Sequence, residues 1–327
     1  MQKTKKYSIY EIVGYVFTFI GIILFIWFVV RSCHDKYIIW NNPISLDNAS
    51  KFGDFVGGFI GVMFTISGVF LLFATLTLQR KEFMESRKAF HKQQLETSLF
   101  NLLSSQREML MNISYKEHNG RLFFTFIKSE LRKAYNLIMD TDTNNINSDT
   151  QTIIYEMLTI DYVVKRHKKE KSFFDDDTTK VTAFKEIFKD IDKSKEKHIL
   201  SEAYWIVFYK YHNYYGHYFR HLYHILKFLD IEQSFEMKND FPNNAKGSQY
   251  LADIVQATLS SDELFVLFCN GLCFNNMKKY LHKFAFLENL PKEDLFKPEH
   301  DNFYSEEEID GVKYSKINFK SMDNSVS

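Results

Sequence analysis

The chain has 327 residues, 45% of them hydrophobic, and its 41 basic and 41 acidic side chains give a formal net charge of zero. A neutral chain has no global attraction to nucleic acid or to acidic lipid. Three cysteines, Cys33, Cys269 and Cys273, are too few for a disulfide framework. Composition and charge therefore argue against a basic nucleic-acid-binding protein and against a small disulfide-rich domain.

Two long apolar runs lie near the N-terminus. No charged residue occurs between positions 12 and 30, and none between positions 55 and 79. About 20 apolar residues in a helix cross the hydrocarbon core of a bilayer. We therefore predict a transmembrane hairpin in residues 1–79, with spans at about 11–31 and 54–79. The first run is longer than a signal-peptide core and is not followed by a cleavage site, so we expect an uncleaved anchor.

The positive charges around these runs predict their orientation. Lysines and arginines concentrate before the first run and after the second, with fewer in the loop that joins the runs. Because such residues favour the cytoplasmic side, we expect a multi-pass protein with both termini in the cytoplasm and the lipid bilayer as a partner. The flanking residues are Lys3, Lys5, Lys6, Arg80, Lys81, Arg87, Lys88 and Lys92, and those of the loop are Arg31, Lys36 and Lys51.

Small residues recur every four positions along the second run, and two glycines lie seven apart on the first. Small residues at helical spacing let two helices approach closely in lipid. Two interpretations remain open: the runs pack against each other within one chain, or they join copies of the chain into a homo-oligomer. Glycine is also simply common in membrane helices. The candidate packing residues are Gly14, Gly21, Gly53, Gly57, Gly61 and Thr65.

The rest of the chain predicts an all-α fold. No glycine or proline occurs between Gln79 and Gly120, so residues 80–119 are expected to form a helical stalk. Periodic apolar residues predict a cytoplasmic helical domain over residues 120–290, large enough for its own core. Its helices are expected near 121–139, 153–164, 180–191, 199–229, 249–259 and 261–287. The polar, aperiodic residues 291–327 are expected to be a largely disordered tail.

One predicted helix is unusually rich in aromatic residues. AYWIVFYKYHNYYGHYFRHLYHILKFL begins at Ala203, and Tyr215, Phe219 and Leu222 place an apolar stripe on one side of it. The opposite side carries a polar strip. Its members are Asn213, His217, Arg220 and His224.

Four interpretations of this polar strip are open. It can be a polar seam packed against another helix, or a site for a ligand or anion built on Arg220 with one of the histidines. A metal site would need further ligands, which no other Cys or His pair supplies at matching spacing. A ribonuclease of the HEPN type carries an arginine and a histidine with four to six residues between them, whereas three separate Arg220 from His224.

Catalytic signatures are missing from the sequence. No phosphate-binding loop, dinucleotide fingerprint, nucleophile elbow or zinc-protease motif occurs. We expect no cofactor and no metal, and whether the protein is an enzyme stays open. We do not expect nucleic acid as a partner, because Lys210, Arg220 and Lys227 are the only lysines and arginines within the aromatic stretch.

A second block, ATLSSDELFVLFCNG, predicts a helix start. Ser260 and Glu263 have the spacing of a capping box, in which each side chain bonds the other residue's backbone amide. Leu264 then enters the core. Asn270 beside Gly271 indicates either a kink or a contact with a partner.

Six blocks together resemble a bacterial family of putative phage abortive infection proteins. In order they are FGDFVGGFIGVMF, TLTLQRKEF, SLFNLLSSQ, HYFRHLYHILKFLD, ATLSSDELFVLFCNG and KYLHKFAFLENL, and they cover about residues 52–290. The family carries a proline in its second span and an arginine near the second block, where this chain has Val62 and Gln256. The residues within these blocks that we single out are Tyr218, Phe219, Arg220, Leu222, Tyr223, Leu259, Ser260, Glu263, Leu264 and Asn270.

This resemblance implies a role in antiphage defence at the bacterial inner membrane, by halting or killing the infected cell. The leading hypothesis is a membrane-anchored effector whose cytoplasmic domain senses a phage-derived or defence-system trigger and whose spans, joined into a homo-oligomer with the stalk, act on the membrane. A membrane-tethered HEPN-like ribonuclease toxin is one alternative. A non-catalytic anchor that recruits a defence partner is the other.

Overall fold

A computed structural model describes residues 9–34, 46–168, 177–238 and 245–321 of the chain. The chain forms two compact units, unit 1 (Met1–Thr97) and unit 2 (Ser98–Ser327). Both are built from helices, with only two-stranded ribbons in addition among the described residues, so the predicted all-α class is confirmed. One helix, α3 (Gly61–Asn112), contributes its first part to unit 1 and its last part to unit 2.

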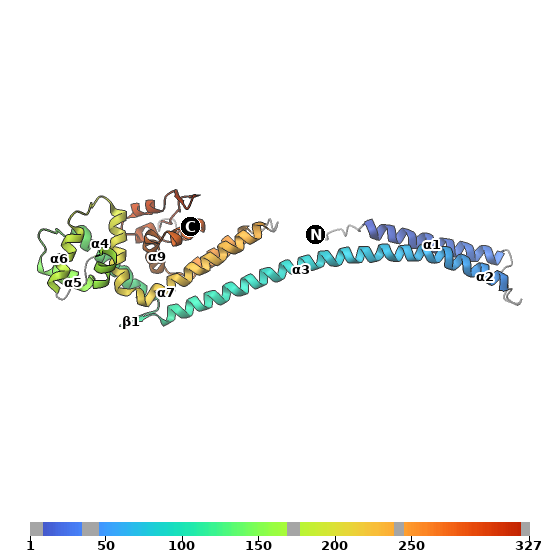
Figure 1. Ribbon diagram of the computed structural model, residues 1–327, viewed down its shortest axis with the longest axis horizontal. Helices are drawn as coiled ribbons and strands as arrows, with labels where there is room; N and C mark the ends of the chain where they lie inside the picture. The colour runs from blue at the N-terminus through green and yellow to red at the C-terminus, as the bar shows by residue number, and fades with distance from the viewer. Residues whose placement is uncertain (1–8, 35–45, 169–176, 239–244, 322–327) are drawn as a thin grey trace. The chain divides into compact units, whose positions relative to one another are not determined.

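Unit 1 contains α1 (Ile9–His34) and the first part of α3, which lie side by side (Figure 1). Helix α2 (Leu46–Phe55) and the π-helical turn η1 (Val56–Ile60) lead without a break into α3. Asp47 in the first turn of α2 bonds Lys51 one turn later at 2.6 Å, which supports a helical start there. Val62, in the neighbourhood where the resemblance implies a proline, lies in regular α-helix just after η1.

The two helices of unit 1 contact each other at the glycines of α1. A Cβ atom added to Gly14 would lie 2.9 Å from the side chain of Leu71, and one added to Gly21 would lie 3.4 Å from Phe64. The buried hydroxyl of Ser67 donates to the carbonyl oxygen of Gly14 at 2.8 Å. Side chains of α3, and not its glycine repeat, therefore face the glycines of α1.

The glycine repeat itself is open within one chain. Added Cβ atoms at Gly53 and Gly57 would meet nothing within 4 Å, and one at Gly61 would meet only the carbonyl oxygen of Val56. Thr65 bonds back to the Gly61 carbonyl of its own helix. Packing inside the hairpin thus leaves this face of residues 53–65 without a neighbour from α1.

Two helices of the described chain are long and apolar enough to cross a membrane: Ile9–His34 and the continuous helix Ala49–Asn112. In their most apolar windows, 11% and 17% of the residues are buried, whereas the core helix of a soluble protein is mostly buried. Large apolar side chains such as Phe19 (65% exposed) and Trp27 (60%) point outward from α1. This pattern suggests association with a membrane.

Unit 2 begins with the last part of α3, followed by a short ribbon of β1 (Ser114–Tyr115) and β2 (His118–Asn119). The predicted stalk helix therefore ends at Asn112. The further helices are α4 (Arg121–Asp140), α5 (Ser148–Met157), the π-helical turn η2 (Tyr162–Arg166), α6 (Asp177–Phe188), α7 (Glu196–Lys238), α8 (Ala245–Ala257), α9 (Ser261–Cys273) and α10 (Asn275–Lys283).

Helix α7 is the central element of unit 2, in contact with α4, α8 and α9 (Figure 1). The predicted apolar stripe is correct in its main part, because Tyr215, Phe219 and Leu222 are buried. The ring of Tyr215 lies among Phe123 and Phe124 of α4, with ring centroids 6.1 and 6.4 Å away. Aromatic packing thus joins α4 to α7.

The single helix predicted over residues 261–287 is wrong. Phe274 takes an extended conformation (φ −122°, ψ 98°), which ends α9 and starts α10. Two asparagines follow it, and asparagine is a weak helix former. The chain then turns again at Ala285, whose φ of 48° lies in the left-handed region. Apolar periodicity continues through the break, which is why the sequence pattern hides it.

The expected disordered tail is also wrong for residues 291–321; residues 322–327 lie outside the described residues. This segment contains the 3-10 helices η4 (Lys292–Asp294) and η5 (Pro298–Tyr304), then the hairpin of β3 (Glu307–Ile309) and β4 (Val312–Tyr314). Tyr304 is fully buried, and its hydroxyl donates to the carbonyl oxygen of Phe268 at 2.8 Å. A few buried anchors hold this segment, although it has no periodicity.

Gly271 gives the buried Tyr304 side chain room to pack against α9. A Cβ atom at this position would lie 2.2 Å from the Tyr304 hydroxyl oxygen and 2.6 Å from Leu281. Of the two sequence interpretations, a kink at residues 270–271 is not observed, since α9 continues to Cys273. The glycine provides room for the C-terminal segment.

Candidate functional site

The polar strip predicted from the sequence, which we call the α7 strip, lies on the exposed side of α7. The strip consists of Asn213, His217, Arg220 and His224. All four are exposed, and within the described residues none of their side chains forms a hydrogen bond or an ion pair. A seam packed against another helix would bury these side chains, so the structure gives no support to that interpretation. Lys227, one turn further along the same face, is exposed as well. The strip is therefore a basic, solvent-facing helix surface.

His221, next to the α7 strip, has a separate role. Its Nδ1 atom lies 2.7 Å from Oε1 of the buried Gln106 in α3, and Gln106 Nε2 donates to the Tyr218 carbonyl at 3.3 Å. Since Oε1 is an acceptor, Nδ1 carries the proton. Burial lowers the pKa of His221, and nearby His224 lowers it further. This neutral histidine ties α7 to the end of α3.

Glu263 is the most deeply placed acid of the motif block, with no exposed surface. The predicted capping box is present: Ser260 Oγ accepts from the Glu263 amide at 3.3 Å, and Glu263 Oε2 accepts from the Ser260 amide at 2.7 Å. Its other oxygen accepts from the Tyr218 hydroxyl, and Arg121 Nε lies 3.6 Å from Oε2. Glu263 therefore caps α9 and binds α7 to it.

Tyr218 stays protonated beside Glu263. Burial raises the pKa of Tyr218, and the charge of Glu263 raises it further. Sequence analysis predicted the cap but missed the Tyr218–Glu263 bond, because the two residues are 45 positions apart and no local pattern connects them.

Most other residues of the motif block are framework. Asn270 Nδ2 donates to the buried Tyr204 hydroxyl at 2.6 Å. Gln256, in the neighbourhood where the resemblance implies an arginine, is buried, donates to the Phe286 carbonyl at 3.0 Å and accepts from Asn289 at 2.6 Å. Phe219, Leu222 and Leu264 are buried, Tyr223, Leu259 and Ser260 are half-buried, and Arg220 is exposed.

A second buried acid, Glu202, escaped sequence analysis. Its carboxylate accepts from the Tyr162 hydroxyl at 2.8 Å and from Arg166 at 2.7 Å, with His167 at 3.3 Å. Burial by itself raises the pKa of Glu202, but hydrogen bonds from His167, Arg166 and Tyr162 outweigh it and lower the pKa to about 2. The cluster joins η2 to α7 and is occupied by its own partners.

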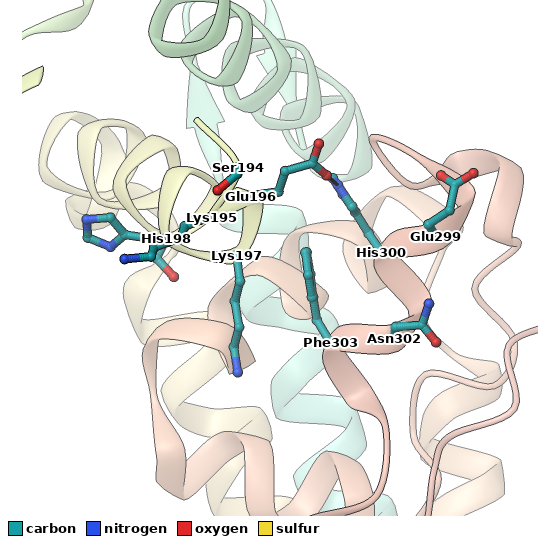
Figure 2. Close-up of a pocket in the computed structure, with 10 residues that line it drawn as sticks. Ser194, Lys195, Glu196, Lys197, His198, Glu299, His300, Asn302 and Phe303 are labelled. Atoms are coloured by element: carbon teal, nitrogen blue, oxygen red, sulfur yellow. Dashed lines mark hydrogen bonds and ion pairs between the residues drawn. The ribbon is translucent and has the colours of Figure 1, made fainter. Parts of the chain in front are cut away.

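A surface hollow of about 690 Å³ lies where α7 begins and η5 passes it (Figure 2). The sequence predicted none of its residues, although the run SKEKH at 194–198 is dense in lysine and histidine. At its edge, Nε2 of the buried His300 lies 2.7 Å from Glu196. The lining residues are Ser194, Lys195, Glu196, Lys197, His198, Ser201, Glu299, His300, Asn302 and Phe303.

Metal binding finds no geometric basis within the described ranges, which contain no group of three or more His, Cys, Asp or Glu side chains able to hold an ion. Cys269 and Cys273 are free thiols, and burial raises the pKa of Cys273 to about 12. These thiols are therefore protonated at neutral pH and are weak nucleophiles.

Comparison with known proteins identifies one family. The model of a family described as putative phage abortive infection protein matches residues 210–295. No curated protein and no solved structure matches the chain. The matched segment holds the α7 strip, the Tyr218–Glu263 bond and helices α8 to α10, so three of the six blocks that carry the sequence resemblance lie within it. Over residues 210–295 this chain is therefore similar to the putative phage abortive infection proteins, as its sequence predicted.

Proposed function

We propose that this protein is an abortive-infection effector anchored in the bacterial cell membrane, with two spans and both termini in the cytoplasm. Unit 2 binds a phage-derived or defence-system trigger, and the spans act on the membrane. The match of residues 210–295 to the phage abortive infection family carries the defence role. The two apolar helices support the membrane part.

The α7 strip is the surface we assign to trigger recognition. The family-matched segment buries Tyr218, Phe219 and Leu222, yet it leaves Arg220 and His224 in solvent. A structural role for these two side chains would require partners, and within the described chain they have no hydrogen bond or ion pair. An exposed helix face with a guanidinium between two imidazoles suits an acidic protein surface.

The open glycine repeat is the surface we assign to self-association. Gly57 and Gly61 have space beside them in one chain, and small residues permit close contact between helices in lipid. A second copy would complete this contact. Oligomerisation of the spans then provides a route by which the effector impairs the membrane.

Membrane potential tests the proposal directly. A voltage-sensitive dye is followed in cells that express the protein, with and without phage. We expect depolarisation on infection that is lost in Gly57→Leu and Gly61→Leu. The control is Val62→Leu, at an exposed position next to Gly61 that points to another side of the helix. Protection from phage with an intact potential would refute the membrane part of the proposal.

The two alternatives make different predictions. A ribonuclease working through the α7 strip requires Arg220 and His224. Protection that persists in the Arg220→Ala/His224→Ala variant therefore excludes the ribonuclease alternative. A recruiting anchor protects only when the native neighbouring genes are present. An effector that acts by itself protects without them.

A further inference from the structure

The hollow at the start of α7 has the features of a ligand site separate from the α7 strip. Its volume of about 690 Å³ lies within the range of about 300–1,000 Å³ typical of small-molecule sites. Two segments a hundred residues apart form its walls, the first turn of α7 and the 3-10 helix η5. The ring of Phe303 points from η5 toward that first turn (Figure 2).

The hollow is lined by two lysines and two glutamates, and within the described residues one of these lysines, Lys197, has no acid partner. Glu196 is occupied, since it bonds Lys297 and lies 2.7 Å from His300 Nε2. Lys197 has no carboxylate within ion-pair distance in the part of the chain that the structure describes. Its neighbour Lys278 is buried and already holds Glu307. Glu307 thus pairs with Lys278, and the ammonium group of nearby Lys197 stays without a salt bridge among the described residues.

The nearby Lys197 ammonium affects the pKa of Lys278. Burial lowers the pKa of Lys278, Glu307 raises it, and the nearby Lys197 ammonium lowers it again. A negative group placed next to Lys197 would relieve this repulsion. The hollow therefore favours an anion on its α7 side.

The backbone of α7 favours an anion at the same place. The first amides of a helix have no partner inside the helix and carry the positive end of its dipole, which suits phosphate. Within the described residues, the amides of Glu196 and Lys197 form no hydrogen bond, whereas those of Lys195 and His198 bond backbone carbonyls. The 43-residue α7 thus presents two donors beside the Lys197 side chain.

Phe303 adds an aromatic surface on the opposite wall. Its ring stacks on that of His300, with centroids 4.8 Å apart and planes 26° apart, and it also lines the hollow. Aromatic rings stack well on flat ligand rings. Glu299, exposed and without an ion pair among the described residues, lies on the same wall as Phe303 and disfavours ligands with several negative charges.

We propose that this hollow binds a small molecule that carries one phosphate group and a flat aromatic ring. The phosphate lies against the first turn of α7 and Lys197, and the ring lies against Phe303. The site does not depend on the role proposed for the α7 strip or for the membrane spans, because its test measures binding and not phage protection.

Isothermal titration of the full chain in detergent tests the site with AMP, ribose 5-phosphate, adenosine and inorganic phosphate. We expect AMP to bind, and ribose 5-phosphate to bind about tenfold more weakly, the cost of about 1.4 kcal/mol for a lost stacking contact. Adenosine, which lacks the phosphate, should be weaker than AMP by at least that factor. No AMP binding at millimolar concentration overturns the proposal.

Two variants test the residues. Lys197→Gln, at an exposed position, should weaken AMP binding about tenfold. Lys313→Gln, an exposed lysine on β4 outside the hollow, is the matched control and should bind as the wild type does. Equal affinity of Lys197→Gln and the wild type overturns the phosphate assignment. Phe303→Leu should remove the preference for AMP over ribose 5-phosphate, and a retained preference overturns the ring assignment.

Discussion

The two units of this protein place their aromatic residues in opposite environments. On α1 in unit 1, Phe19 and Trp27 are 65% and 60% exposed, whereas in unit 2 Phe124 and Tyr215 are completely buried. Similar side chains point outward in one region and inward in the other because the solvents we infer for the regions differ. Hydrocarbon accepts an apolar exterior, while water drives the same residues into a core.

Polar groups differ between the units in the same way. The apolar helices of unit 1 satisfy hydroxyls such as Thr75 and Thr77 through carbonyls of their own helix. Unit 2 buries the carboxylates Glu202 and Glu263, each held by several donors from other elements. Buried charges of this kind make unit 2 sensitive to single substitutions and to acid.

The strongest test places the same charge in both regions. Phe124→Lys should abolish folding of unit 2, because it buries an unpaired ammonium among aromatic rings at a cost of more than about 4 kcal/mol. Phe19→Lys should leave unit 2 folded but weaken membrane insertion by about 3 kcal/mol. Near-ultraviolet circular dichroism reports the first effect and membrane fractionation the second. If Phe19→Lys fractionates as the wild type does, the exterior of α1 does not face lipid.

Acid should reveal the buried charge at Glu202. Its pKa is lowered from 4.5 to about 2 in the folded protein, so the stabilisation is complete above pH 4.5 and is lost as the pH falls toward 2. A lowering of this size corresponds to about 3 kcal/mol. Thermal unfolding measured between pH 6 and pH 2 gives the slope of stability against pH. Glu202→Gln should flatten it, and a slope that Glu202→Gln leaves unchanged contradicts the prediction.

A pair of glycines compares packing in the two units. Gly271→Ala should destabilise unit 2 by about 1–3 kcal/mol, since the new methyl group meets the Tyr304 hydroxyl and Leu281. Gly68→Ala meets nothing within 4 Å and should be neutral or slightly stabilising, as alanine is favoured over glycine within a helix. Thermal melts of both variants settle the comparison. Equal melting temperatures of Gly271→Ala and Gly68→Ala would mean that the C-terminal segment shifts at Tyr304 at little cost in stability.

The smallest effect concerns the cap of α9. Ser260→Ala removes the acceptor for the Glu263 amide and should cost about 1 kcal/mol of unfolding free energy, measured by denaturant titration. Ser260→Asp keeps a capping oxygen and serves as the control for the amide bond. A loss as large in Ser260→Asp as in Ser260→Ala would show that the cap contributes little. In unit 1, by comparison, no side chain caps η1.

Local sequence patterns were sufficient for several features of this protein. Uncharged runs predicted two long apolar helices, the spacing of Ser260 and Glu263 predicted the capping box, and Tyr215, Phe219 and Leu222 predicted the buried face of α7. Each depends on residues within a few helical turns of one another. Such features can be read directly from the order of residues.

The remaining features depend on residues far apart in the chain. The Tyr218–Glu263 bond, the Glu202 cluster and the hollow between α7 and η5 each join segments 36 to 104 positions apart. The break at Phe274 was mispredicted because apolar periodicity continues through it. The packed C-terminal segment was mispredicted because Tyr304 and Gly271 fit only once the chain has folded back. Local periodicity thus determined the helices and their apolar faces. Tertiary contacts decided where the helices end, which acids are buried and where a ligand has room.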